Sequence, residues 1–129
     1  MSWTLQRHDV YAATVRRYYA HHDMRRPSFL VLTALAGAGH LHGYGLVRAI
    51  ESMTDGAESL SLGGVYGVLD RLEGLGQVRL HSETVEAGRP RRYYAITEPG
   101  REALAGETDR MEADVRLGRR MLQVPGGAS

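Results

Sequence analysis

Apolar side chains recur three and four positions apart in the first part of the chain, a spacing typical of amphipathic helices. It predicts a helix over residues 3–24. The apolar face of this helix carries Tyr11, Val15, Tyr18 and His22. Pro27 is expected to end it, and Ser28 to cap a second, short helix over the apolar sequence FLVLTALA. Gly37 and Gly39 are expected to end the second helix.

The same periodicity predicts two more helices. The first follows the sequence LHGY, in which His42 either caps the helix or makes a structural hydrogen bond. Its inner face carries Leu46, Val47, Ile50 and Met53. The second is capped by Ser59 or Ser61 and closed by Gly76. Its inward residues are Val65, Leu69 and Leu72.

After Gly76 the period of the apolar positions changes from that of a helix to that of a strand. Val78 and Leu80 alternate with polar residues, and beyond a turn Tyr94 and Ile96 alternate with their neighbours. Strict alternation over two runs separated by a turn predicts two antiparallel strands, each with one buried face.

A long final helix is predicted after the strands, with Thr97 as its cap and Pro99 in its first turn. Apolar and small residues form a heptad seam along it, at Leu104, Thr108, Met111, Val115, Gly118 and Leu122. The rest of the domain is too small to cover a seam of this length, so we expect a second copy of the chain to pack on it. The predicted dimer-interface residues are Leu104, Met111, Val115 and Leu122.

The order helix, helix, helix, hairpin, helix predicts a mainly α protein with a small β-hairpin, in the α+β class. It is the winged helix-turn-helix arrangement, with an extra amino-terminal helix and a carboxy-terminal dimerisation helix. The expected segments are 1–27 for the extra helix, 28–97 for the winged helix, 98–122 for the dimerisation helix and 123–129 for a flexible tail. Domains of this type place a helix in the major groove of DNA.

The composition narrows the functional class. The chain of 129 residues has no cysteine, which excludes disulfides and thiolate metal sites and suits a reducing compartment. No apolar run is long enough to span a bilayer, and the first residues lack the apolar centre of a secretion signal. We therefore expect a cytoplasmic protein without a membrane partner. No paired acid and base or activated nucleophile stands out, so we expect neither an enzyme nor a bound cofactor.

Positive charge is concentrated although the net charge is only +1. All basic residues are arginines. Residues 1–27 contain five arginines and two acidic residues, and residues 77–97 contain four arginines and two acidic residues. The second group includes the hairpin sequence GRPRR, residues 88–92. Glycine in such a tip allows a close approach and proline limits what must be ordered on binding, while an arginine between them can enter the narrow, electronegative minor groove. The alternative is a solvated turn in which Arg91 and Arg92 pair with Glu83 or Glu86.

Three segments together resemble the PadR family of bacterial transcriptional regulators. They are LHGYGLVRAIE, LSLGGVYGVLDRLEGLG and GRPRRYYAITEPGREAL, and the resemblance covers about Ser28 to Leu104. It implies a homodimeric repressor that binds a pseudo-palindromic operator and releases it when a small molecule is sensed. The positions that it assigns to DNA contact are Ser61, Gly63, Tyr66, Arg71 and Arg89. Gly64, which points outward from the same helix, and Arg91 of the hairpin are further predicted contacts. Gly64 and Gly67 depart from the family, whose members often carry larger residues there.

Other roles remain open at this level. The first helix could pack on the partner's last helix through its aromatic residues, or add DNA contacts through its arginines. An effector cavity would lie between these helices, lined by Trp3, Tyr11, Tyr18 and Met111. A metal sensor built on His21-His22 or His40 and His42 is disfavoured because cysteines and clustered carboxylates are missing, so we expect no metal site. A winged helix that acts only through protein contacts is the remaining alternative.

Overall fold

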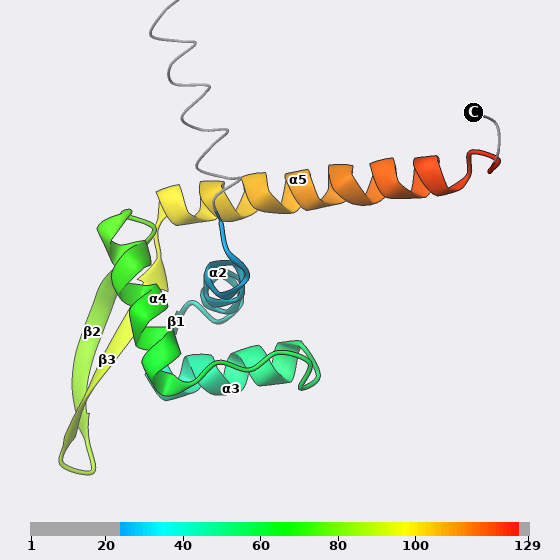
Figure 1. The fold of residues 1–129 in the computed structure, drawn as a ribbon. Coiled ribbons are helices and arrows are strands. Elements are labelled where there is room, and N and C mark those ends of the chain that lie inside the picture. Colours follow the sequence, from blue (N-terminus) through cyan, green and yellow to red (C-terminus); the bar gives the residue numbers. More distant parts are fainter. Residues whose placement is uncertain (1–23, 127–129) are drawn as a thin grey trace, which may run out of the picture.

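The computed structural model describes residues 24–126, which form a small helical body with a β-hairpin and one long helix (Figure 1). The elements in chain order are α2 (Arg26–Ala38), β1 (His40–Leu41), α3 (Gly43–Met53), α4 (Leu62–Gly74), β2 (Val78–Glu86), β3 (Arg89–Ile96) and α5 (Glu98–Leu122). This order confirms the winged helix-turn-helix class. The predicted first helix and the end of the tail lie outside the described residues.

The core lies where α2, α3 and α4 meet the sheet. Helix α2 runs through the centre of the body, between α3 on one side and α5 on the other (Figure 1). Its residues Val31, Leu32 and Leu35 are completely buried, in keeping with its almost continuous apolar sequence. The inward residues predicted for α4 are buried as well, at Val65, Leu69 and Leu72. Burial of such side chains contributes about 1.5–3 kcal/mol each.

Helix α2 begins earlier than the sequence predicts. Arg25, rather than Ser28, is its N-cap residue, and Pro27 lies in its first turn instead of ending the preceding segment. Proline fits a first turn because the N–H that it lacks has no partner inside the helix. Ser28 is therefore buried within the helix, and Gly39, with a φ of 90°, ends it.

The predicted caps of the other helices are confirmed. His42 Nδ1 accepts a hydrogen bond from Gly45 N at 2.8 Å, at the start of α3. Ser61 Oγ accepts from Gly64 N at 3.0 Å, at the start of α4. Thr97 Oγ1 accepts from Gly100 N at 3.1 Å, at the start of α5. Each cap satisfies one of the backbone donors that a helix start leaves without a partner.

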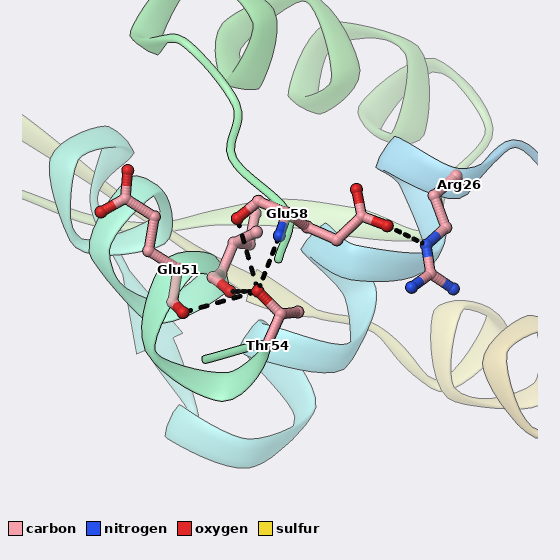
Figure 2. A network of polar contacts seen from close by, with 5 residues as sticks. Arg26, Glu51, Thr54 and Glu58 are labelled. Atoms are coloured by element: carbon pink, nitrogen blue, oxygen red, sulfur yellow. Dashed lines mark hydrogen bonds and ion pairs between the residues drawn. The ribbon is translucent and has the colours of Figure 1, made fainter. Parts of the chain in front are cut away.

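The loop between α3 and α4 is held by one side chain (Figure 2). Thr54 Oγ1 donates to Ile50 O at 2.8 Å and accepts from Glu58 N at 3.1 Å. Glu58 also pairs with Arg26, whose Nε lies 2.9 Å from Glu58 Oε1. These contacts tie the loop to the first turn of α2. Met53, predicted to face inward at the end of α3, is exposed instead, because the helix ends there and the chain turns away.

The sheet has three antiparallel strands in the order β1-β3-β2, so it contains one strand that the sequence pattern did not predict. Strand β1 is only two residues long and pairs His40 with Ala95 and Leu41 with Tyr94. Ala95, predicted to face outward, is buried. In β2 the register shifts between Leu80 and Ser82, which marks a bulge.

The hairpin turns at Ala87 and Gly88, one position before the tip expected from the sequence. Both residues have positive φ, 50° and 76°, which is the signature of a type I′ turn. Arg89 is consequently the first residue of β3 and lies opposite Glu86. The left-handed conformation is costly for alanine, so this turn is held by the pairing of the two long strands.

Helix α5 packs on α2 only near its beginning and then extends away from the body (Figure 1). Leu104 packs against the core of its own domain, and Met111 is half-buried. Val115 is 50% exposed and Leu122 is 87% exposed. The outer part of the predicted seam is therefore an open apolar face.

Candidate nucleic-acid interface

A groove of about 130 Å³ lies between the start of α3, the first turns of α4 and the beginning of β3. Its lining residues are His42, Gly43, Tyr44, Tyr66, Arg89, Pro90, Arg91 and Arg92. Three of the residues predicted to contact DNA, from two segments distant in the sequence, thus meet in one place: Tyr66, Arg89 and Arg91. We call this site the wing groove.

Tyr66 occupies the α4 side of the wing groove. Its side chain is 41% exposed, and its ring lies directly against the backbone of Gly43. A Cβ atom at Gly43 would come within 2.9 Å of both Cζ and the hydroxyl oxygen of Tyr66. Gly43 is thus the residue that allows the tyrosine to pack across the start of α3.

The start of α3 adds backbone donors to the groove. The His42 cap satisfies the N–H of Gly45, while the N–H groups of Gly43 and Tyr44 belong to the first turn and have no partner inside the helix. These groups carry the positive end of the helix dipole. Backbone donors of this kind favour a negatively charged ligand.

The arginines of the hairpin differ in what they can offer. Arg92 Nε lies 2.9 Å from Glu83 Oε1, and Arg91 Nε lies 3.1 Å from Glu86 Oε2, as the solvated-turn alternative predicted. The contact of Arg91 has the distance of an ion pair but not the geometry of a hydrogen bond. Arg89 forms no ion pair or hydrogen bond within residues 24–126, so among the three arginines that line the wing groove its guanidinium is the one that a ligand can engage without breaking a contact.

Aromatic rings brace the base of the hairpin beside the groove. The rings of His40 and His81 stack with their centroids 4.4 Å apart, and those of His42 and Tyr93 stack at 5.2 Å. The Tyr93 hydroxyl donates to Glu86 Oε1 at 2.8 Å, and this hydrogen bond to a carboxylate raises the pKa of Tyr93. These side chains link β1, β2 and β3 and hold the hairpin in a defined direction.

The other residues of α4 and its N-cap that were predicted to contact DNA lie outside the wing groove. Ser61 is exposed, but its hydroxyl is engaged by the cap. Gly63 and Gly64 are exposed in the first turn. Arg71 and Gly64 line a second hollow, on the side of α4 that faces α2. The structure therefore divides the predicted DNA contacts between two places.

Several groove residues were not predicted from the sequence as contacts, namely His42, Gly43, Tyr44 and Arg92. The LHGY sequence was noted as a helix start, as part of the family resemblance and, through His42, as a disfavoured metal site. Its position beside the wing depends on tertiary packing. Of the predicted effector residues, Trp3, Tyr11 and Tyr18 lie outside the described residues, while Met111 lies on α5.

No cluster of three or more histidine and carboxylate side chains within residues 24–126 could hold a metal ion. No helix in this range is long and apolar enough to cross a membrane.

The fold and the wing groove define a winged-helix regulator, and a family comparison agrees. Residues 31–106 match the transcriptional regulator PadR-like family, and the chain belongs to this family. This range agrees closely with the span of the resemblance noted in the sequence. The family is one of transcriptional regulators, the class that the sequence predicts.

Individual relatives are distant. The transcriptional regulator YqjI of Escherichia coli K12 is 30% identical over 97 residues, which are 75% of this chain and 43% of that protein. The chain thus spans less than half the length of the curated relatives that it matches.

Solved structures share the fold at low sequence identity. A PadR family regulator from Eggerthella lenta has a TM-score of 0.62 at 20% identity, over 94% of this chain and 99% of that one. Bacillus subtilis PadR in complex with operator DNA has a TM-score of 0.57 at 20% identity, over 64% of this chain and 46% of that one.

Proposed function

We propose that this regulator is a homodimeric repressor that binds a pseudo-palindromic DNA operator through α4 and the wing, and that a small molecule releases it. The observation that carries the proposal is the wing groove, where Tyr66, the unpaired Arg89 and the start of α3 converge. The operator complex of the B. subtilis relative supports DNA as the ligand.

The groove has the chemistry to hold a phosphate of the DNA backbone. Arg89 supplies a full positive charge, Tyr66 a hydroxyl donor and the first turn of α3 free backbone N–H groups. Charge-assisted hydrogen bonds of this kind are about twice as strong as neutral ones. Contacts to phosphate fix the position of a protein on the duplex without recognising sequence.

Helix α4 is the element that enters the major groove in this proposal. Gly63, Gly64 and Gly67 leave its exposed face flat, which allows a close approach to the bases. Asp70 and Glu73 are exposed further along the helix and repel phosphate. Base recognition by α4 is therefore sparse, and much of the affinity comes from the backbone.

The dimer follows from the open face of α5. Val115 and Leu122 are apolar, exposed and seven residues apart, as a helix that packs on a second copy requires. Two recognition helices about 34 Å apart would reach successive major grooves. We place the effector site next to this interface, between the predicted first helix, with Trp3, Tyr11 and Tyr18, and Met111 of α5.

Replacing Arg89 with alanine is expected to weaken operator binding by about 1–3 kcal/mol, because one charge-assisted contact to DNA is lost. The slope of log affinity against log salt should also fall by about 1 if that contact is to a phosphate. Operator affinity measured over a series of salt concentrations checks both values. Arg101→Ala is the matched control, since Arg101 is exposed and has no ion pair within residues 24–126. Equal affinities for the two variants would remove the wing from the interface.

Replacing Gly43 with alanine is expected to lower operator affinity while leaving the fold intact. The new methyl group would displace the Tyr66 ring, which is partly exposed and free to swing out. We expect a loss of about tenfold, the size of one charge-assisted hydrogen bond. In Tyr66→Phe the Gly43→Ala change should then add little, because the hydroxyl is already missing. Additive losses in the double variant would contradict this coupling.

A winged helix that acts through protein contacts alone is the second candidate, favoured by the exposed Asp70 and Glu73 on α4. The two functions differ in a gel-shift assay against the promoter region of the protein's own gene. No retardation at low salt, with the dimer intact, would favour the second candidate.

A further inference from the structure

The second hollow has a volume of about 260 Å³ and lies between the start of α2 and the side of α4. Its lining residues are Arg25, Pro27, Ser28, Gly64, Gly67, Val68 and Arg71. Gly64 and Gly67, at the edge of the exposed face of α4, form part of its wall, so no side chain from these positions fills it. A Cβ atom at Gly67 would meet nothing within 4 Å. We call this site the α2 hollow.

Ser28 is an unusual residue in the α2 hollow. It is only 6% exposed, yet its hydroxyl has no hydrogen-bond partner within residues 24–126. The hydroxyl is not sealed in the core, because Arg91 Nε is the one fully buried side-chain polar atom without a partner in the part of the chain that the structure describes. The hydroxyl opens to the hollow that Ser28 lines, where it can donate a hydrogen bond to a ligand.

The backbone N–H of Ser28 also has no acceptor within α2. The cap residue Arg25 makes no side-chain hydrogen bond to the helix start, and the first helical bond runs from Phe29 N to Arg25 O at 3.1 Å. The N–H of Ser28 thus has no partner inside the helix, and α2 is long enough, at 13 residues, to have a dipole. A ligand beside Ser28 would meet two donors and the positive end of the helix.

The charged groups in the α2 hollow have one sign. Arg25 and Arg71 line it, no carboxylate does, and neither arginine forms an ion pair within residues 24–126. The next residue, Arg26, is different because it is engaged by Glu58 (Figure 2). Two free guanidinium groups beside a helix start give strong attraction for an anion.

We propose that the α2 hollow is an oxyanion site that binds a phosphate group through Ser28, the start of α2, Arg25 and Arg71. It is separate from the wing groove and lies on the other side of α4. The phosphate can belong to the DNA backbone or to a free phosphorylated molecule. Phosphate binding in the α2 hollow does not depend on the proposed function, but the assignment of that phosphate to DNA rests on it.

The first experiment uses the full chain and inorganic phosphate. Thermal unfolding is followed during a phosphate titration in which chloride keeps the ionic strength constant. We expect phosphate to raise the unfolding temperature until the site is saturated. The phosphate affinity obtained from this curve should be about tenfold lower in Ser28→Ala and in Arg71→Ala, because each substitution removes a donor to a charged group. Arg101→Ala is the matched control and should behave as the unchanged protein. Circular dichroism verifies that each variant is folded.

The second experiment identifies the source by measuring operator affinity against salt for the same variants. If DNA supplies the phosphate, Arg71→Ala lowers the salt slope by about 1 and Ser28→Ala weakens binding at an unchanged slope. If the ligand is a free phosphorylated molecule, both variants bind DNA normally but have lost their response to inorganic phosphate. A response to phosphate in a protein that does not retard DNA would support the site and refute the proposed function.

The proposal is overturned if both Ser28→Ala and Arg71→Ala behave like Arg101→Ala in the phosphate titration and in the salt dependence of DNA binding. A specific loss in either experiment supports it. Arg71→Lys adds a further check, because it should retain part of the phosphate response through its charge alone.

Discussion

Replacing Gly100 with alanine is expected to destabilise the protein by about 3 kcal/mol, the upper part of the range for overpacked sites. A Cβ atom at this position would lie 2.1 Å from Gln77 O and 2.8 Å from Ile96 Cγ1. The carbonyl of Gln77 cannot move freely, since it accepts a hydrogen bond from Thr97 N at 3.0 Å. The first turn of α5 would therefore have to separate from the start of β2.

Urea unfolding followed by circular dichroism measures this loss. Gly37→Ala is the matched control, because Gly37 lies in α2 with nothing within 4 Å of an added Cβ atom. The control should be up to about 1 kcal/mol more stable than the unchanged protein, through helix propensity alone. A Gly100→Ala variant as stable as the control would mean that α5 does not begin against β2.

The start of α5 illustrates which features the sequence predicts well. Thr97 was predicted as a cap, Ser61 as one of two candidate caps and His42 as a cap or a structural hydrogen bond, and each accepts a bond from the N–H three residues later. Such a contact is local, so residue type and spacing are sufficient to predict it. The same holds for the buried faces of α2 and α4, which follow from helical periodicity.

Features that depend on distant partners were missed or misplaced. Strand β1 has two residues, too few for a pattern, and exists because His40 and Leu41 pair with β3. The start of α2 was misplaced because Pro27 fits either a helix end or a first turn, and the sequence does not decide between them. Arg91 could not be assigned to Glu86 before the register of the hairpin was known.

The candidate site shows the same division. Tyr66 and Arg89 were chosen for their chemistry, and the fold brings them to one groove. Gly43 and Tyr44 complete that groove only because α3 begins beside Tyr66, which is a tertiary fact. Arg71, predicted as part of the same interface, lies in the α2 hollow with Ser28, whose role as a helix cap was wrong.

Replacing both Val115 and Leu122 with glutamate is expected to dissociate the proposed dimer and to lower operator affinity by about 100-fold or more. The two side chains are exposed in the single chain, so the charges do not disturb its core, but in a dimer they would be buried without partners. Loss of the second half-site contact removes the avidity of a linked pair, which is worth about 10²–10⁴ in affinity.

Leu117→Glu is the matched control, because Leu117 is 47% exposed on the same helix but lies off the heptad seam. Sedimentation equilibrium should find the control dimeric and the double variant monomeric. Operator titration should place the control near the unchanged protein, because its recognition helices keep their spacing. A double variant that stays dimeric would show that another surface joins the two chains. A monomeric double variant that still binds the operator with full affinity would show instead that one winged helix suffices, and the palindromic operator would lose its physical basis.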